Sequence, residues 1–260
     1  MQQIFDSHAH YDDAAFDPDR AALLASLPGQ GVCGIINAAS NLASARAGIA
    51  LAAQYGYLYA AVGIHPLDAE TAPDLDNAMT QLRVLAAQPK VVAIGEIGLD
   101  FHYDVPRVIQ LPLLRRQLAL ANDLHLPVIL HDREAHGPML DLLREFRPAG
   151  VVHCFSGSVE MAREVLALGL YIGLGGAVTF KNAVHPLEVA AMVPPDRLLL
   201  ETDAPYMTPV PLRGKRNDSA KIAYTAEKIA AVRGVDPQTL CNETCQNACR
   251  LFGIDAEKLG

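Results

Sequence analysis

Two histidines two residues apart, His8 and His10, stand near the start of the chain in the stretch IFDSHAH, directly behind a short β-prone run. Imidazole is a common ligand of divalent metals, and side chains two residues apart on a strand point to the same face. With nine histidines in 260 residues, however, such a triplet also arises easily by chance. The pair raises the hypothesis of a metal site, which depends on what else the chain brings beside it.

Further histidines and carboxylates follow other β-prone runs. They are His65 in GIHP, Glu96 and Asp100 in AIGEIGLD, His131 in VILHDRE, His153 in VVHCFSG, and Glu201 and Asp203 in LLLETDAP. A single residue of this kind is more often a hydrogen-bonded structural group than a ligand. Independent structural residues have no reason to choose the same end of successive strands, whereas neutral imidazole and carboxylate are the ligands that divalent metals require. Jointly, these residues predict a metal site.

Counting ligands indicates how many ions the site holds. The candidate ligands are His8, His10, Glu96, His131, His153 and Asp203, which is more than a single catalytic zinc uses while keeping a position open for water. We therefore expect two divalent ions, with Glu96 as the bridging carboxylate at the separation of about 3.5–4 Å used by paired-metal enzymes. His8 and His10 would hold one ion, and His131 and His153 the other. Mg²⁺ or Mn²⁺ is the expected ion in use, and Zn²⁺ suits the imidazole ligands.

The elements that must position these residues follow from the alternation of β-branched runs with longer amphipathic runs, which is typical of a parallel sheet. The expected strands are 2–7, 32–38, 57–62, 91–95, 127–131, 150–154, 170–174 and 197–201. Eight strands in 260 residues without a linker predict a single domain over 1–260, an α/β chain folded as a (β/α)₈ TIM barrel. Such barrels carry catalytic groups at the C-terminal ends of their strands. An open doubly wound sheet is the alternative architecture.

The last part of the chain predicts extra C-terminal helices. Beyond residue 217 the pattern is helical, with Gly234 and Pro237 separating two helices. Cys241, Cys245 and Cys249 recur every four residues and would line one helical face, which favours packing over a metal cluster. An odd number of cysteines, five, is not a disulfide framework and agrees with a reducing compartment.

Composition limits the partners and the location. With 51% hydrophobic and 19% charged residues, the chain is typical of a soluble globular protein. It shows neither a signal peptide nor a run of about 18 apolar residues, so we expect a cytoplasmic protein with no membrane partner. A net charge of −8 argues against broad electrostatic binding of nucleic acid, so a polyanion must be held locally.

The densest positive segment is RGKR, with Arg213, Lys215 and Arg216, directly after the last expected strand. It would lie near the barrel mouth and hold backbone phosphates of single-stranded DNA, with Lys181 as a possible helper. A solvated charged loop is the alternative interpretation.

The sequence resembles the TatD-type metal-dependent deoxyribonucleases, within the wider amidohydrolase-like superfamily of barrels. The motifs DSHAHY, GIHP, GEIGLDF, LPVILHDREA, HCFSGS, ETDAPYMTP and RGKRN occur in the family's order, and NETCQNACRLFG is similar to its C-terminal signature. The resemblance covers almost the whole chain. It implies a TIM barrel and a two-metal hydrolase, with the same six ligands and with His65 as a further active-site residue.

Some positions depart from the family's common pattern. Ala9 and Tyr11 replace the small or thiol residue and the leucine that are usual, and Ser219 stands where proline is common. None of these positions is a proposed ligand, so the departures concern the substrate mouth.

The chemistry expected at such a centre is hydrolysis by activated water, because paired metals lower the pKa of water and offset charge on a phosphoryl oxygen. Asp203 would ligate and act as general base, and His65 would orient a phosphate oxygen or assist the leaving group. A structural role for His65 beside Pro66 is an alternative.

Three functions compete. The first is an exonuclease acting on single-stranded DNA or DNA ends. The second is an amidohydrolase or esterase acting on a small metabolite or an aminoacyl-tRNA ester. The third is a non-catalytic protein in which metal only stabilises the barrel. The RGKR segment favours the first. Glu96, in place of a carboxylated lysine, argues by analogy against the typical amide-ring hydrolases.

Overall fold

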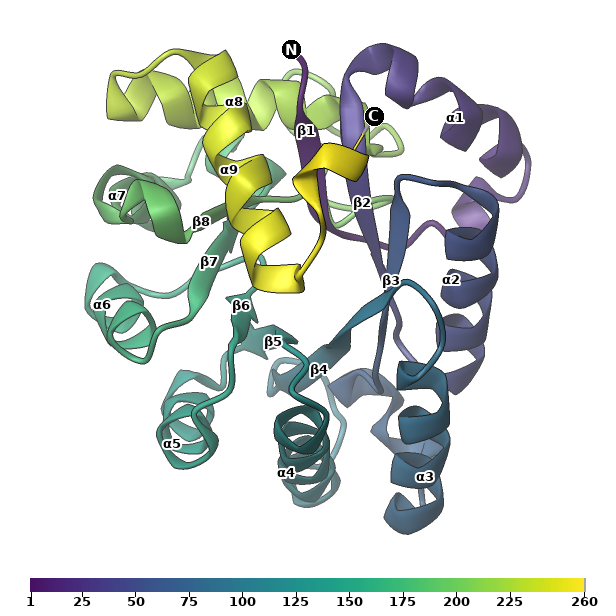
Figure 1. Cartoon of the computed structure of the whole chain (residues 1–260). Coiled ribbons are helices and arrows are strands. Elements are labelled where there is room, and N and C mark those ends of the chain that lie inside the picture. Colours follow the sequence, from purple (N-terminus) through teal and green to yellow (C-terminus); the bar gives the residue numbers. More distant parts are fainter. Residues whose placement is uncertain (260) are drawn as a thin grey trace.

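The computed structural model describes residues 1–259 and shows a ring of parallel strands surrounded by helices (Figure 1). Each strand pairs in parallel with the next one along the chain, in the order β1 to β8. The strands are β1 (Ile4–Ala9), β2 (Val32–Ala38), β3 (Leu58–Val62), β4 (Val91–Asp100), β5 (Val128–Arg133), β6 (Gly150–Val152), β7 (Tyr171–Leu174) and β8 (Leu198–Leu200).

The connections between strands are helical. The α-helices are α1 (Arg20–Ser26), α2 (Leu42–Gln54), α3 (Leu75–Ala86), α4 (Arg107–Leu124), α5 (His136–Phe146), α6 (Val159–Ala167), α7 (Val184–Met192), α8 (Ile222–Arg233) and α9 (Pro237–Phe252). Short 3₁₀ helices are η1 (Ala14–Phe16), η2 (Pro28–Gln30), η3 (Pro66–Thr71), η4 (Gly176–Thr179), η5 (Pro195–Arg197), η6 (Ser219–Lys221) and η7 (Ala256–Lys258). The predicted TIM barrel with extra C-terminal helices is confirmed, and the open doubly wound sheet is excluded.

The barrel closes between β1 and β8 largely through residues that follow β8. The Asp203 N–H donates to the His8 carbonyl at 2.9 Å, and the His10 N–H donates to the Ala204 carbonyl at 2.7 Å. Asp6 adds a buried side-chain link, accepting from the Thr202 N–H at 3.0 Å. This closure brings the segment after β8 alongside the two N-terminal histidines.

Several strand boundaries differ from the predicted ones. The first strand is Ile4–Ala9, where 2–7 was predicted, so His8 lies inside it. The fourth strand, predicted to end at residue 95, continues to Asp100 because residues 97–100 remain paired with β5 beyond a register shift. Glu96 therefore lies within β4 and not at its end. The sixth and eighth strands end at Val152 and Leu200, which leaves His153, Glu201 and Asp203 in the segments just beyond.

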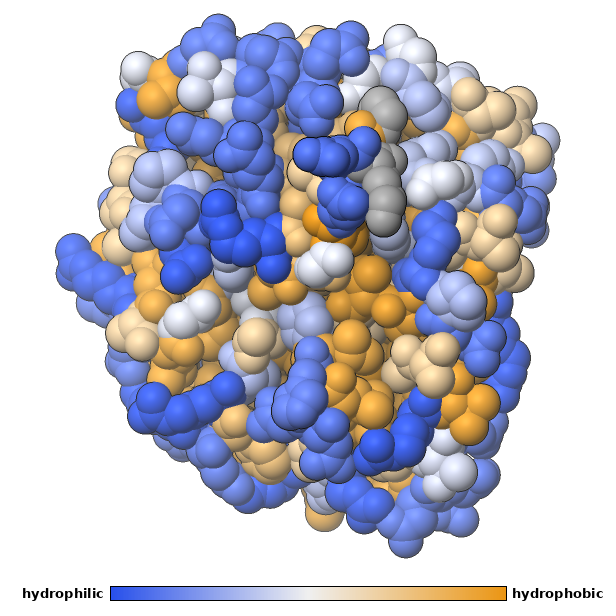
Figure 2. All heavy atoms as spheres, in the orientation of Figure 1, coloured by the Kyte–Doolittle hydropathy of each residue, from blue (hydrophilic) through white to orange (hydrophobic). Residues whose placement is uncertain are grey.

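Helix α9 lies across the N-terminal end of the barrel, in the foreground of Figure 1. Its buried face packs against the N-terminal end of the barrel interior, for example Phe5. The residues of this face are Cys245, Ala248, Cys249 and Phe252. The cysteine face thus serves packing, with the Cys245 Sγ 3.6 Å from the Cys33 Sγ. In the space-filling view, hydrophobic residues gather in the middle of this face and hydrophilic residues cover most of the periphery (Figure 2).

None of the helices in residues 1–259 combines the length and the apolar character that crossing a membrane requires.

Candidate metal centre

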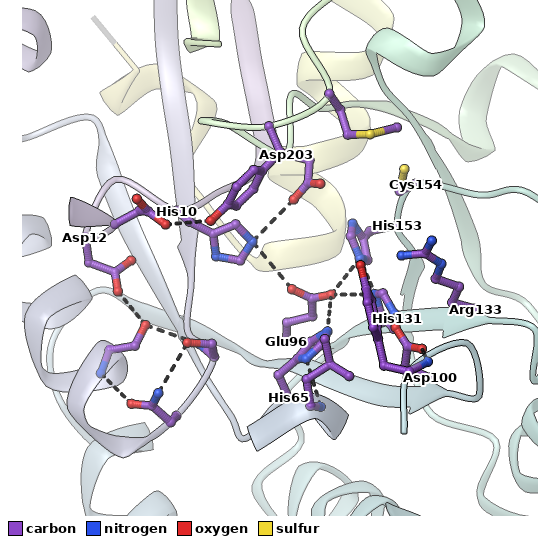
Figure 3. A pocket seen from close by; sticks show the side chains of 18 of the residues that line it. His10, Asp12, His65, Glu96, Asp100, His131, Arg133, His153, Cys154 and Asp203 are labelled. Carbon is purple, nitrogen blue, oxygen red and sulfur yellow. Dashed lines mark hydrogen bonds and ion pairs between the residues drawn. The ribbon is translucent and has the colours of Figure 1, made fainter. Parts of the chain in front are cut away.

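A cavity of about 1160 Å³ opens at the C-terminal ends of the strands, the end opposite α9. Its lining includes most of the predicted site residues: His10, His65, Glu96, His131, His153 and Asp203. His8 lies directly beneath, fully buried in β1. The seven residues come from six different strands or the segments that follow them, so the fold brings together the polar residues that the sequence separates. All of them except His8 are labelled in Figure 3.

Glu96 occupies the middle of this group, with only 3% of its surface exposed. Its Oε2 atom is 3.2 Å from His8 Nε2 and 3.5 Å from His10 Nε2. Its Oε1 atom is 2.7 Å from His153 Nε2 and 3.0 Å from His131 Nδ1. One carboxylate oxygen therefore faces each of the two predicted histidine pairs, which is the arrangement expected of a bridging ligand.

Asp203 completes the side of the site formed by β1. Its Oδ1 atom is 3.3 Å from His10 Nε2 and 3.7 Å from His8 Nε2. The two histidine Nε2 atoms are themselves 3.0 Å apart, so three potential ligand atoms converge. The backbone at Asp203 is left-handed, with φ of 57°, a conformation that Asp and Asn tolerate better than most residues.

In His10 and His131, the ring nitrogen that faces away from the centre forms a hydrogen bond, and this decides which nitrogen can bind a metal ion. His10 Nδ1 is 2.9 Å from the Ala38 carbonyl, so it carries the proton and leaves the Nε2 lone pair facing the centre. His131 Nε2 is 3.0 Å from Asp100 Oδ2, which leaves its Nδ1 lone pair facing Glu96. With these hydrogen bonds, both imidazoles present a lone pair that suits a divalent metal ion.

His65 differs from His10 and His131 because the nitrogen that it turns toward the centre carries a proton. Its Nδ1 accepts a hydrogen bond from the Leu67 N–H at 3.1 Å, at the start of η3, so the neutral ring carries its proton on Nε2. That Nε2 is 3.3 Å from Glu96 Oε1. His65 is therefore placed as a hydrogen-bond donor within the site, and its capping of η3 gives it a structural role as well.

The electrostatics of the centre follow from burial and from the close approach of opposite charges. Burial opposes ionisation of Glu96, but the surrounding His153, His65 and His8 outweigh it and hold the pKa of this carboxyl well below its usual value. Burial and the nearby charge of His153 lower the pKa of His8 to about 4, so His8 is neutral and able to ligate at pH 7.

His10 and His131 differ from His8. Burial lowers the pKa of each ring, but their carboxylate partners outweigh it and raise the pKa to about 10 for His10 and about 9 for His131. In the absence of metal these two rings hold protons that bound cations would displace.

The RGKR segment lies outside the cavity lining. Arg216 pairs with Asp19 through two contacts of 2.7 Å, and Arg213 lies 3.8 Å above the centre of the Phe180 ring. Lys215 is exposed. The described residues that line the cavity include none of the three, so their role toward a substrate stays a prediction about the rim.

Two further residues of the site had no role assigned from the sequence. Glu201 is buried, accepts a hydrogen bond from the Cys154 N–H, and lies 3.8 Å from His153 Nδ1; burial raises its pKa to about 8. Arg133 lines the cavity at the end of β5. Its spacing of two from His131, which places both side chains on one face of a strand, was the signal available.

Comparisons with known proteins identify the family of the chain. The sequence model of the family described as "TatD related DNase" matches residues 5–253. The chain is 40% identical over 256 residues to the "Uncharacterized metal-dependent hydrolase YabD" of Bacillus subtilis, covering 97% of this chain and 100% of that protein. It is 38% identical over 261 residues to the "3'-5' ssDNA/RNA exonuclease TatD" of Cronobacter sakazakii, covering 96% and 97%.

Solved structures show the same relationship. The crystal structure of YJJV, a TatD homologue from Escherichia coli K12, superposes with a TM-score of 0.91 at 36% identity, over 97% of this chain and 99% of that one. An Entamoeba histolytica TatD-family hydrolase, 23% identical with a TM-score of 0.88, shares the fold. The family model matches nearly the whole chain, these relatives are similar over nearly their full length, and the barrel gathers these residues at one mouth. The chain therefore belongs to the TatD family of metal-dependent hydrolases.

Proposed function

We propose that this protein is a deoxyribonuclease that hydrolyses phosphodiester bonds in single-stranded DNA or at DNA ends, using two divalent ions. The observation that carries the proposal is Glu96, a buried carboxylate with one oxygen toward each pair of histidines. Relatives named as 3'-5' ssDNA/RNA exonucleases support the class of substrate.

In this proposal His8, His10 and Asp203 would hold one ion, His131 and His153 would hold the other, and Glu96 would offer a carboxylate oxygen to each. Mg²⁺ or Mn²⁺ is the proposed ion in use, with Zn²⁺ also suited to the imidazole nitrogens. The pair of bound ions would lower the pKa of water and offset negative charge on a phosphoryl oxygen.

Asp203 acts as the proton acceptor. Burial raises the pKa of its carboxyl, but the hydrogen bond from His10 and the charges of the nearby histidines outweigh it and lower the pKa overall. The group is ionised at neutral pH, and its side chain keeps 21% exposure, so water reaches it. An ionised carboxylate at this position can orient a water molecule and take its proton as the phosphorus is attacked.

His65 acts as a donor in the proposed mechanism. With its proton on Nε2, it can hydrogen-bond a non-bridging phosphate oxygen or the departing oxygen, in place of its present contact with Glu96. The exposed Arg213 and Lys215 would contact phosphates farther along the strand, outside the cavity.

The proposal is tested by a turnover screen of the metal-loaded protein against single-stranded DNA, RNA, a small phosphodiester and cyclic amides, with carboxylic and aminoacyl-tRNA esters as further substrates. We expect digestion of single-stranded DNA to have the highest kcat/KM. Turnover of an amide or ester with no cleavage of DNA would replace the nuclease with the amidohydrolase or esterase alternative.

A further inference from the structure

The cavity wall is rich in carboxylates, which poses a problem for an anionic substrate. Beyond the central group it includes Asp12, Asp13, Asp100 and Asp132. Among the described lining residues, Arg133 is the single lysine or arginine. A phosphodiester chain that enters this cavity therefore meets one permanently cationic side chain besides any bound metal.

The Arg133 guanidinium is free to bind an anion. Within residues 1–259 it makes no hydrogen bond or ion pair through its side chain, whereas Arg115 and Arg216, for example, are each held by a carboxylate at the surface. Arg133 lies two residues after His131 on β5, so both side chains point to the same face, about 6–7 Å apart along the strand. Figure 3 shows the guanidinium directed into the cavity beside His153 and Cys154.

An aromatic ring stands next to this cation. The centre of the Tyr103 ring is 5.1 Å from the guanidinium carbon of Arg133, and Tyr103 also lines the cavity with 51% of its surface exposed. A half-exposed tyrosine on a cavity rim leaves a ring face open to a planar group, and every nucleobase has such a face.

The position of Tyr103 is tied to that of the candidate ligand His131 through a single carboxylate. Asp100 Oδ1 accepts hydrogen bonds from the backbone N–H groups of His102 at 2.9 Å and Tyr103 at 3.2 Å. Its Oδ2 is 3.0 Å from His131 Nε2. Asp100 is also paired in register with Arg133. Asp100 thus links the Tyr103 backbone, the position of Arg133 on β5 and the metal-facing imidazole of His131.

We infer that Arg133 and Tyr103 form a nucleotide subsite beside the metal centre, in which the guanidinium grips the phosphate next to the scissile one and the Tyr103 ring stacks on that nucleotide's base. The inference rests on the proposed nuclease function and specifies how the substrate is held. Phosphate and the π-face are common to all nucleotides, so this subsite binds without base preference.

The test compares kinetics on a single-stranded DNA oligomer with hydrolysis of bis-nitrophenyl phosphate, which spans only the metal centre. Arg133→Ala and Tyr103→Ala are each expected to raise the KM for the oligomer roughly tenfold, the usual scale for one lost stacking contact or bidentate phosphate contact. The rate of hydrolysis of the small phosphodiester should change by less than about twofold under the same conditions. Tyr103→Phe should restore the wild-type KM because it keeps the ring, whereas Arg133→Lys should restore it only in part because it loses the planar fork.

Two control variants remove similar groups outside the cavity lining. Arg107 stacks on Phe101 at 4.1 Å and is exposed, and Tyr224 is exposed on α8. Arg107→Ala and Tyr224→Ala should leave the KM for the oligomer unchanged.

Modified substrates assign each contact. A neutral methylphosphonate placed in turn at the phosphates flanking the scissile bond should abolish the difference between wild type and Arg133→Ala at one position. An abasic nucleotide should likewise abolish the Tyr103→Ala difference.

Three outcomes would contradict the proposal. If the wild type digests DNA and both alanine variants match it, the subsite is overturned and the nuclease function stands. Equal losses on both substrates would also overturn it, because the centre itself would be damaged. Wild type that cleaves the small phosphodiester and no DNA would overturn the proposed function, and the subsite with it.

Discussion

At the scale of single residues, the centre depends on which nitrogen each histidine presents. His10 presents Nε2 because Ala38 accepts from its Nδ1, and His131 presents Nδ1 because Asp100 binds its Nε2. His65 presents an N–H group because its Nδ1 accepts from the Leu67 backbone. Residues of one type thus take two roles, potential ligand and donor, through their hydrogen-bond partners.

Replacement of Glu96 tests the bridge. Glu96→Gln keeps the shape of the side chain, but its amide nitrogen has no lone pair to offer, so one of the two ions loses a ligand. We expect two ions per chain in the saturated wild type after desalting and at most about one in the variant, measured by elemental analysis. The exposed Glu227→Gln on α8 is the matched control. Two ions retained by Glu96→Gln would remove the bridge from the proposal.

Replacement of Asp203 tests the proton acceptor. Asp203→Asn suits the left-handed backbone at this position, so the fold and part of the metal should be retained. Loss of a general base should lower kcat by at least about a hundredfold, measured on single-stranded DNA together with metal content and circular dichroism. Near-normal turnover at full metal loading would reassign Asp203 to a structural role.

At the scale of elements, the close approach of β4 and β5 places Glu96 beside His131. A Cβ atom at Gly98 would lie 1.9 Å from the His131 carbonyl oxygen, so the strands can approach this closely only with glycine there. The register shift in β4 next to Glu96 accompanies the same contact. The GEIGLD stretch thus supplies both the carboxylate and the space that it needs.

The segment that follows β8 offers a test of the rim prediction. Arg216 fixes the loop to Asp19, so Arg213→Ala with Lys215→Ala removes exposed charge without breaking that pair. If both residues contact phosphates, binding of single-stranded DNA weakens and the slope of log K against log salt flattens by roughly 1.4. Hydrolysis of a small phosphodiester should persist. The double variant Arg163→Ala with Lys228→Ala, of equal charge change on α6 and α8, is the control, and an unchanged salt slope in the loop variant would contradict the prediction.

Helix α9 is held to the barrel by a buried amide. Asn247 Nδ2 donates to the carbonyls of Pro195 at 2.7 Å and Leu198 at 2.9 Å. Asn247→Ala leaves both carbonyls without this donor and should lower the free energy of unfolding by about 1–3 kcal/mol, measured by urea denaturation. Asn242→Ala, exposed on the same helix, should change it by less than about 0.5 kcal/mol. Equal stability of the two variants would show that packing alone holds α9.

At the scale of the whole molecule, the barrel has a large apolar core that does not include the metal centre. We therefore expect chelation to abolish activity while cooperative thermal unfolding is retained, with activity restored by Mn²⁺ or Mg²⁺. Activity assays and calorimetry on the same chelated sample check this. Loss of the folded state on chelation would favour a structural role for the metal.

The sequence by itself determined the alternation of strands and helices, the eight-stranded barrel and the residues around the centre, because side-chain periodicity and residue type are local properties of a chain. Only the tertiary structure placed Glu96 within β4 with an oxygen toward each histidine pair, since that depends on a register shift between neighbouring strands. It also placed Arg133, and none of the RGKR residues, on the cavity wall. Where a charged side chain ends up depends on the carboxylates and rings that pack around it, and these come from distant parts of the chain.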